Sequence, residues 1–167
     1  MASKLLASLF GYKSWANIKL FEVVASAVPA DHSTYRRSIV RTLNHIHIVD
    51  RIFRAHLLGE RHEYIGTNTD ATPNLDELRL AVAETDLWFE QYVATVDRSA
   101  LAEPIKFQFT DGDRGQMTRE EVLLHVITHG AWHRGEVGQI LEGHSVPSPP
   151  DSLTKFLHAT QPSRREA

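Results

Sequence analysis

The sequence predicts an all-α protein: a four-helix bundle with a long crossover between helices 2 and 3 and a short β-hairpin before helix 4. Three observations lead to this fold. Four stretches carry apolar residues at a spacing of three and four, which is typical of amphipathic helices. Residues 60–73 have no such period, and residues 104–117 alternate apolar with polar residues around the turn sequence DGDRG.

The length and composition fit one domain. The chain has 167 residues, of which 42% are hydrophobic and 23% charged, as in ordinary globular proteins. We expect a single helical domain over residues 1–160 and a disordered tail at 161–167, where the sequence is QPSRREA.

The first two helices are bounded by proline and glycine. The first is expected at about residues 3–27, because its apolar series stops before Pro29. The second can be capped by Asp31 or Ser33 and should end at Gly59.

The second half begins after the crossover. A third helix is expected after Pro73, with its apolar series running from Leu75 to Val96. The hairpin follows, and then Thr118 and Glu121 form a predicted capping box that starts helix 4. That helix should end at Gly143, and residues 152–159 add one or two further helical turns.

Composition also excludes several function classes. A net charge of −3 argues against a protein that binds nucleic-acid phosphates. There is no cysteine, which rules out disulfides, cysteine-ligated zinc and a thiol nucleophile within the chain. The apolar run near the N-terminus is too short for a signal peptide or a membrane span, so we expect a cytoplasmic protein without membrane or nucleic-acid partners.

The most informative pattern is the histidine series in helix 4. His125, His129 and His133 are spaced by four, so they lie within about 80° on one helical face. Imidazoles at i and i+4 can bind one cation. Alternatively, they are core histidines bonded to carbonyls or carboxylates, because buried polar groups need partners. Val126 and Trp132 flank the series, which predicts that it faces the core and that Trp132 is a core residue or a pocket wall.

Helix 2 offers a further imidazole. His45 shares its face with Val49 and Ile52, whereas His47 lies about 160° away. One imidazole from helix 2 and two from helix 4 would make a three-histidine metal site, although the histidines alone do not establish that these helices touch.

The segments TLNHIHIVDRIF and LLHVITHGAWHRGEVGQIL resemble the DinB/YfiT-like family of four-helix-bundle metalloproteins. The resemblance extends to GYKSWANIKLF in helix 1 and to PPDSLTKFL after helix 4, and it covers nearly the whole chain. It implies a divalent metal, nickel or zinc, held by His45, His129 and His133. His125 matches a family position that is not usually a ligand. The resemblance also implies a homodimer.

This sequence departs from the family pattern at two positions. Trp132 and Glu136 stand where members often have His and usually have Gln. Glu136 is a candidate catalytic residue: it lies on the site face and could orient an imidazole, act as a base near metal-bound water, or bind the metal. The alternative is a salt bridge with Arg134 or Arg51. For His47 and Asp50 we favour surface or interhelix hydrogen bonds over metal ligation.

Three neutral imidazoles leave coordination positions open, which is typical of a catalytic rather than a structural site. Such a metal could activate water, as in a hydrolase, or a small-molecule thiol, as in a thiol transferase. The resemblance implies both, since some members use bacillithiol or mycothiol and others are described as hydrolases. We therefore predict a metal-dependent enzyme, with a non-catalytic metal-binding stress protein as the alternative. A di-iron site and HExxH protease chemistry lack their required residues.

Overall fold

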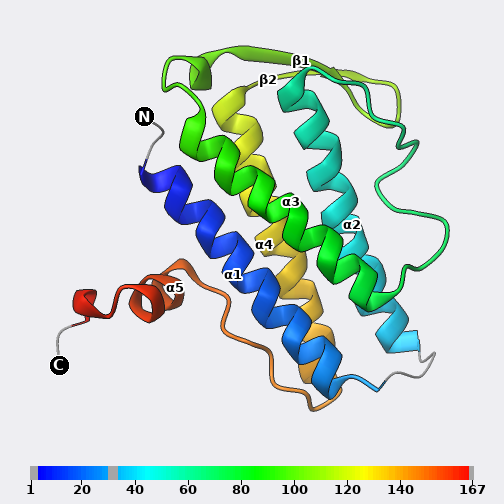
Figure 1. Ribbon diagram of the computed structural model, residues 1–167. Helices are drawn as coiled ribbons and strands as arrows, with labels where there is room; N and C mark the ends of the chain where they lie inside the picture. The colour runs from blue at the N-terminus through cyan, green and yellow to red at the C-terminus, as the bar shows by residue number, and fades with distance from the viewer. Residues whose placement is uncertain (1–3, 30–33, 166–167) are drawn as a thin grey trace.

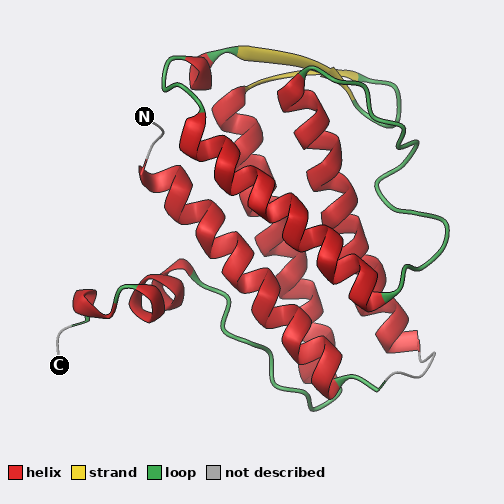
Figure 2. Cartoon of the chain, in the orientation of Figure 1, coloured by secondary structure: helices red, strands yellow, loops and turns green. Residues whose placement is uncertain are grey.

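The computed structural model describes residues 4–29 and 34–165 and contains the predicted bundle (Figures 1 and 2). Four long helices form it: α1 (Lys4–Ala27), α2 (Thr34–Leu58), α3 (Leu75–Thr95) and α4 (Arg119–Gly143). Helix α1 packs mainly on α3, and α2 mainly on α4. The connection between α2 and α3 returns along the bundle, so these two helices run in the same direction (Figure 1).

The local signals act as expected within the described residues. The Thr118 hydroxyl accepts a hydrogen bond from the Glu121 amide, and the Glu121 carboxylate accepts one from the Thr118 amide, which completes the capping box. Gly59 ends α2 with a φ of +70°, a conformation that favours glycine. The proposed caps Asp31 and Ser33 lie outside the described residues.

The hairpin joins β1 (Pro104–Gln108) to β2 (Arg114–Thr118) and lies across one end of the bundle (Figure 1). Its Phe107 side chain enters the core. A short 3₁₀ turn, η1 (Ala100–Ala102), precedes β1. A second, η2 (Pro162–Arg164), follows the short helix α5 (Leu153–Thr160). The predicted tail at 161–167 therefore contains a helical turn, and its last two residues lie outside the described part.

The core has two apolar clusters with a polar layer between them. Phe10, Phe53 and Phe89 belong to the cluster at the hairpin end, and Leu20 and Val137 to the other. The layer between them contains buried charged or amide side chains from all four helices: Lys13, Asn17, Asp50, Asp86 and Arg134. Among the described residues, no helix is both long and apolar enough to cross a membrane.

Candidate metal centre

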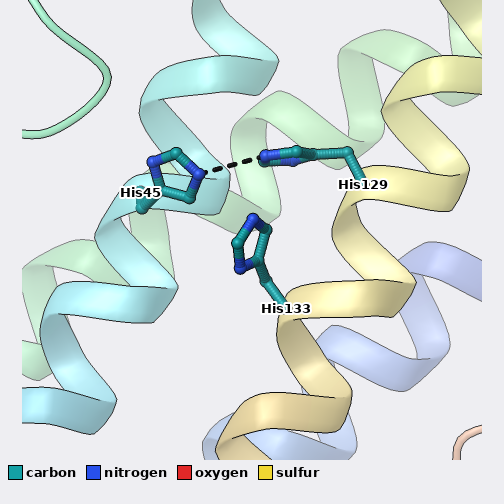
Figure 3. A group of neighbouring side chains, drawn as sticks. All are labelled: His45, His129 and His133. Carbon is teal, nitrogen blue, oxygen red and sulfur yellow. Dashed lines mark hydrogen bonds between the residues drawn. The ribbon is translucent and has the colours of Figure 1, made fainter.

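The structure brings the three predicted ligand histidines together where α2 packs against α4. His45 comes from α2, and His129 and His133 from successive turns of α4 (Figure 3). One nitrogen of each ring lies within 4.8 Å of the others, and the Nε2 atoms of His45 and His129 are 3.1 Å apart. All three side chains are partly buried. The contact between these two helices was the step that sequence could not establish.

The outer nitrogens of two rings have hydrogen-bond acceptors. Nδ1 of His45 lies 2.8 Å from the carbonyl oxygen of Thr67, in the crossover between α2 and α3. Nδ1 of His133 lies 2.6 Å from a carboxylate oxygen of Glu136. Each Nδ1 must donate its proton to that acceptor, so in the neutral form of the ring the lone pair is on Nε2. Metal-binding histidines are commonly oriented by such contacts.

The donor set fits a divalent cation. Metal–nitrogen bonds of about 2.0–2.1 Å at tetrahedral angles would separate two ligand nitrogens by about 3.3 Å. The 3.1 Å between His45 and His129 is close to that value. Nδ1 of His129 is buried without a hydrogen-bond partner among the described residues. The protein therefore orients two of the three imidazoles for a cation and leaves the third less constrained.

The electrostatic environment keeps two of these imidazoles neutral at pH 7. Burial is the largest cause, and it lowers the pKa of His129 to about 3, with smaller contributions from the neighbouring His133, His45 and His125. Burial also lowers the pKa of His45, although its bond to Thr67 acts in the opposite direction. Neutral imidazoles have the lone pair that metal binding requires.

Glu136 lies beside the centre, and its carboxylate accepts two hydrogen bonds. One carboxylate oxygen accepts from His133 and the other from the indole of Trp132, at 3.2 Å. The hydrogen bond from His133 lowers the pKa of Glu136. The alternative partner Arg134 points into the core and binds Asp151 instead. Of the roles considered for Glu136, this geometry supports the orientation of a ligand imidazole.

Other candidates lie outside the triad. The ring of His125 is 5.4 Å from that of His129 and 4.7 Å from that of Phe53, measured between centroids, and it is not among the converging ligands. Asp50 makes the expected interhelix contact: it lies 2.7 Å from Nζ of Lys13. Both Asp50 and His47 are buried, so the alternative of surface hydrogen bonding is wrong.

The prediction that Trp132 belongs to the core is wrong. Its side chain is 72% exposed, and the histidine series lies at the edge of the interface between α2 and α4 rather than in the centre of the core. Trp132 precedes His133 by one residue, and so lies about 100° away from it around the helix. The indole therefore stands on the outer surface beside Glu136.

No pattern in the sequence indicated the buried charges. Lys13 is 1% exposed and contacts carboxylates from two other helices, Asp50 at 2.7 Å and Asp86 at 2.5 Å. The amide of Asn17 donates to Asp86. A lysine in an amphipathic helix normally lies on the surface, and only the position of its partners on α2 and α3 explains why this one is buried.

A four-helix bundle with three convergent imidazoles, two of them neutral at pH 7, defines a class of protein that can hold a divalent metal between its helices. Comparison with known proteins gives the family. The chain belongs to the DinB family, whose model matches residues 1–165. It is 24% identical over 166 residues to Protein DinB of Bacillus subtilis (strain 168), covering 92% of this chain and 94% of that protein. No solved structure matches the chain.

Proposed function

We propose that this protein is a metal-dependent enzyme that uses nickel or zinc, held by His45, His129 and His133, to transfer a low-molecular-weight thiol to an electrophilic substrate. The observation that carries the proposal is the convergence of three imidazole nitrogens, two of them with hydrogen bonds that direct a lone pair inward. Bound there, the cation would lower the pKa of a thiol or water molecule that reaches it.

The hydrogen bonds that Glu136 accepts favour thiol transfer over hydrolysis. Attack by water needs a base to remove a proton, and the carboxylate of Glu136, beside the triad, is the obvious candidate. Both of its oxygens already accept hydrogen bonds, from His133 and Trp132, and its pKa is lowered, which makes it a weaker base. A thiol has a pKa much nearer neutrality than water, so the reaction needs less help from a base.

In the proposed reaction the thiol sulfur forms a bond to an electrophilic carbon. The leaving group departs from that carbon with the electron pair of the broken bond, and the thiol proton passes to solvent, so the products are a thioether, the leaving group as its anion and a proton. No external oxidant or reductant is needed. The thiol must come from outside, because the chain contains no cysteine.

The first test measures metal per chain by mass spectrometry in the wild type and in His45→Ala, His129→Ala and His133→Ala. We expect about one nickel or zinc per chain in the wild type and a loss of metal in each variant. His158→Ala, which removes a histidine from α5, is the matched control and should keep the metal. Wild-type protein that stays metal-free after loading with either ion would disprove the metal centre.

The second test measures thiol consumption in the presence of 1-chloro-2,4-dinitrobenzene, which releases chloride on substitution. Protein thiols do not interfere, because the chain has none. We expect a rate that requires both the metal and the three histidines. A metal-loaded protein that fails with a panel of thiols and electrophiles but hydrolyses ester or amide substrates would support the hydrolase, and one inactive in all screens would support the non-catalytic alternative.

A further inference from the structure

A second candidate site lies at the hairpin end of the bundle, away from the histidine triad. It is a pocket of about 660 Å³ between the last turn of α2, residues 59–65 and strand β1. His56 belongs to its wall, and the helical rise places His56 about 16 Å along α2 from His45. The two sites are therefore separate, although the chain segment that lines the pocket continues to Thr67 beside the triad.

Two imidazoles form one part of the pocket. The ring of His56 stacks on Phe107, with centroids 4.8 Å apart, and meets the ring of His62 at 5.2 Å. Burial, together with the nearby His62, lowers the pKa of His56 to about 4, so this ring is neutral at pH 7. The Nδ1 atom of His62 is buried and has no hydrogen-bond partner among the described residues. Such an atom is costly unless a ligand or water satisfies it.

Two cationic side chains and aromatic rings complete the pocket. Arg61 comes from the crossover and Lys106 from β1, so positive charges are supplied by two different walls. Glu60 is the one carboxylate residue among the lining residues, so the charged side chains there carry a net positive charge although the whole chain is acidic. Phe107 and Phe109 add apolar surface, and Phe109 remains 45% exposed.

We infer that this pocket binds a small organic anion that carries a flat, apolar portion. A carboxylate or phosphate group would pair with Arg61 and Lys106, and an imidazole N–H could donate a further hydrogen bond. The flat portion would pack against the phenylalanine rings of the hairpin. Within the described residues a second metal site is less well supported, because only His45, His129 and His133 form a group of three convergent ligands.

The pocket is connected to the triad by neighbouring rings. His125 lies between them, since its ring is close to those of both His129 and Phe53, and Phe53 contacts His56 at 5.6 Å. A ligand in the pocket would also contact the segment whose Thr67 carbonyl orients His45. The inference does not depend on the proposed thiol chemistry or on metal binding, because all the groups that carry it lie in the pocket.

The test is a titration of the ¹⁵N-labelled full chain with benzoate and with phenyl phosphate, followed by amide chemical shifts. We expect saturable shifts at residues 59–65 and 106–112, both in the protein as purified and in the His129→Ala variant. Benzyl alcohol, a neutral analogue of benzoate, should bind at least about tenfold more weakly, since it lacks the negative charge that strengthens hydrogen bonds from cationic side chains. Binding that survives in His129→Ala separates this pocket from the metal centre.

Charge reversal gives the decisive comparison. Both side chains are exposed, so Arg61→Glu with Lys106→Glu should fold normally and weaken benzoate binding by about tenfold or more. Arg79→Glu with Arg98→Glu applies the same charge change outside the pocket and should leave binding unchanged. Equal binding of benzoate by the two double variants, or shifts confined to the triad, would overturn the inference.

Discussion

Two polar regions of this bundle solve the problem of buried polarity in different ways. In the ion network of Lys13, Asp50 and Asp86, the charge from α1 lies between carboxylates from α2 and α3. In the triad of His45, His129 and His133, three imidazole nitrogens converge, and the carboxylate of Glu136 accepts from Nδ1 of His133 at the side of the group. The network is satisfied largely by the chain itself, whereas the triad is satisfied best by a cation from outside.

The comparison shows how a site differs from a structural polar cluster. The network lies between the two apolar clusters and links three helices, and its lysine is almost fully inaccessible. The triad lies at the edge of the interface between α2 and α4, where its side chains are partly exposed. A ligand can reach the second region but not the first. We therefore expect mutations in the network to change mainly stability and mutations around the triad to change mainly metal binding.

The largest expected effect is that of Lys13→Met. The substitution leaves two buried carboxylates close together without their cation, and breaking a buried ion pair in this way costs about 3–5 kcal/mol. Chemical denaturation of the metal-free protein measures the free energy of unfolding. Lys19→Met, on the same helix, is the control: that lysine is exposed and contacts Glu22 at 2.9 Å, so we expect a loss of about 1 kcal/mol or less.

Equal losses in these two variants would contradict the structural role of the network. A Lys13→Met variant that is as stable as the wild type but no longer binds metal would also reverse the comparison, because it would connect the buried lysine to the triad rather than to the fold.

The next effect is a pH dependence of stability caused by His47. Burial, with smaller effects of Arg51 and Lys13, lowers the pKa of His47 to about 4 from an ordinary value of 6.5. As pH falls from 6.5 to 4, His47 takes up a proton in the unfolded chain but not in the folded protein. The free energy of unfolding therefore falls by up to about 3 kcal/mol. His47→Gln should remove this part of the acid destabilisation. His158→Gln is the control.

Asp50 should act in the opposite direction. Burial is the main cause that raises its pKa to about 6 from 3.8. The folded protein therefore binds the proton of the Asp50 carboxyl group more tightly than the unfolded chain does. The resulting stabilisation is complete below pH 3.8 and is lost as pH rises through about 6. Free energies of unfolding from pH 4 to pH 8 separate the two residues. If His47→Gln and the wild type lose equal stability on acidification, His47 does not carry the predicted proton linkage.

Sequence reasoning predicted the fold because its signals are local. Apolar periodicity, the capping box of Thr118 and Glu121, and glycine after α2 each depend on a few neighbouring residues, and the structure confirms them. The long crossover was also recognisable, since residues 60–73 lack any period. The ligand set followed from the resemblance to a family, and the structure supports it by placing His45 beside His129.

The remaining features depend on contacts between distant segments. Nothing local indicates that Lys13 is buried, that the Thr67 carbonyl orients His45, or that His56 and His62 line a pocket with Lys106. Trp132 was misplaced because a helical face has no sharp edge: large apolar residues that flank a buried series can still lie on its exposed side.

The smallest expected effect distinguishes two of the roles considered for Glu136, orientation of His133 and action as a base. Glu136→Gln should weaken metal binding by roughly 10- to 100-fold, because the carboxylate that accepts from His133 is replaced by a neutral and weaker acceptor. The Glu136 side chain is about half exposed, so the free energy of unfolding of the metal-free protein should change by about 0.5 kcal/mol or less. Competition with a chromogenic chelator measures the affinity, and Glu142→Gln, at an exposed position on the same helix, is the control.

If Glu136→Gln binds metal as tightly as the wild type but turns over substrate much more slowly at saturating metal, Glu136 acts as a base rather than as the residue that orients His133. That outcome would also favour hydrolysis over thiol transfer, since a thiol has less need of a base. If Glu136→Gln instead binds metal more weakly and excess metal restores its rate, orientation is confirmed, because the only defect is then the lower affinity for the cation.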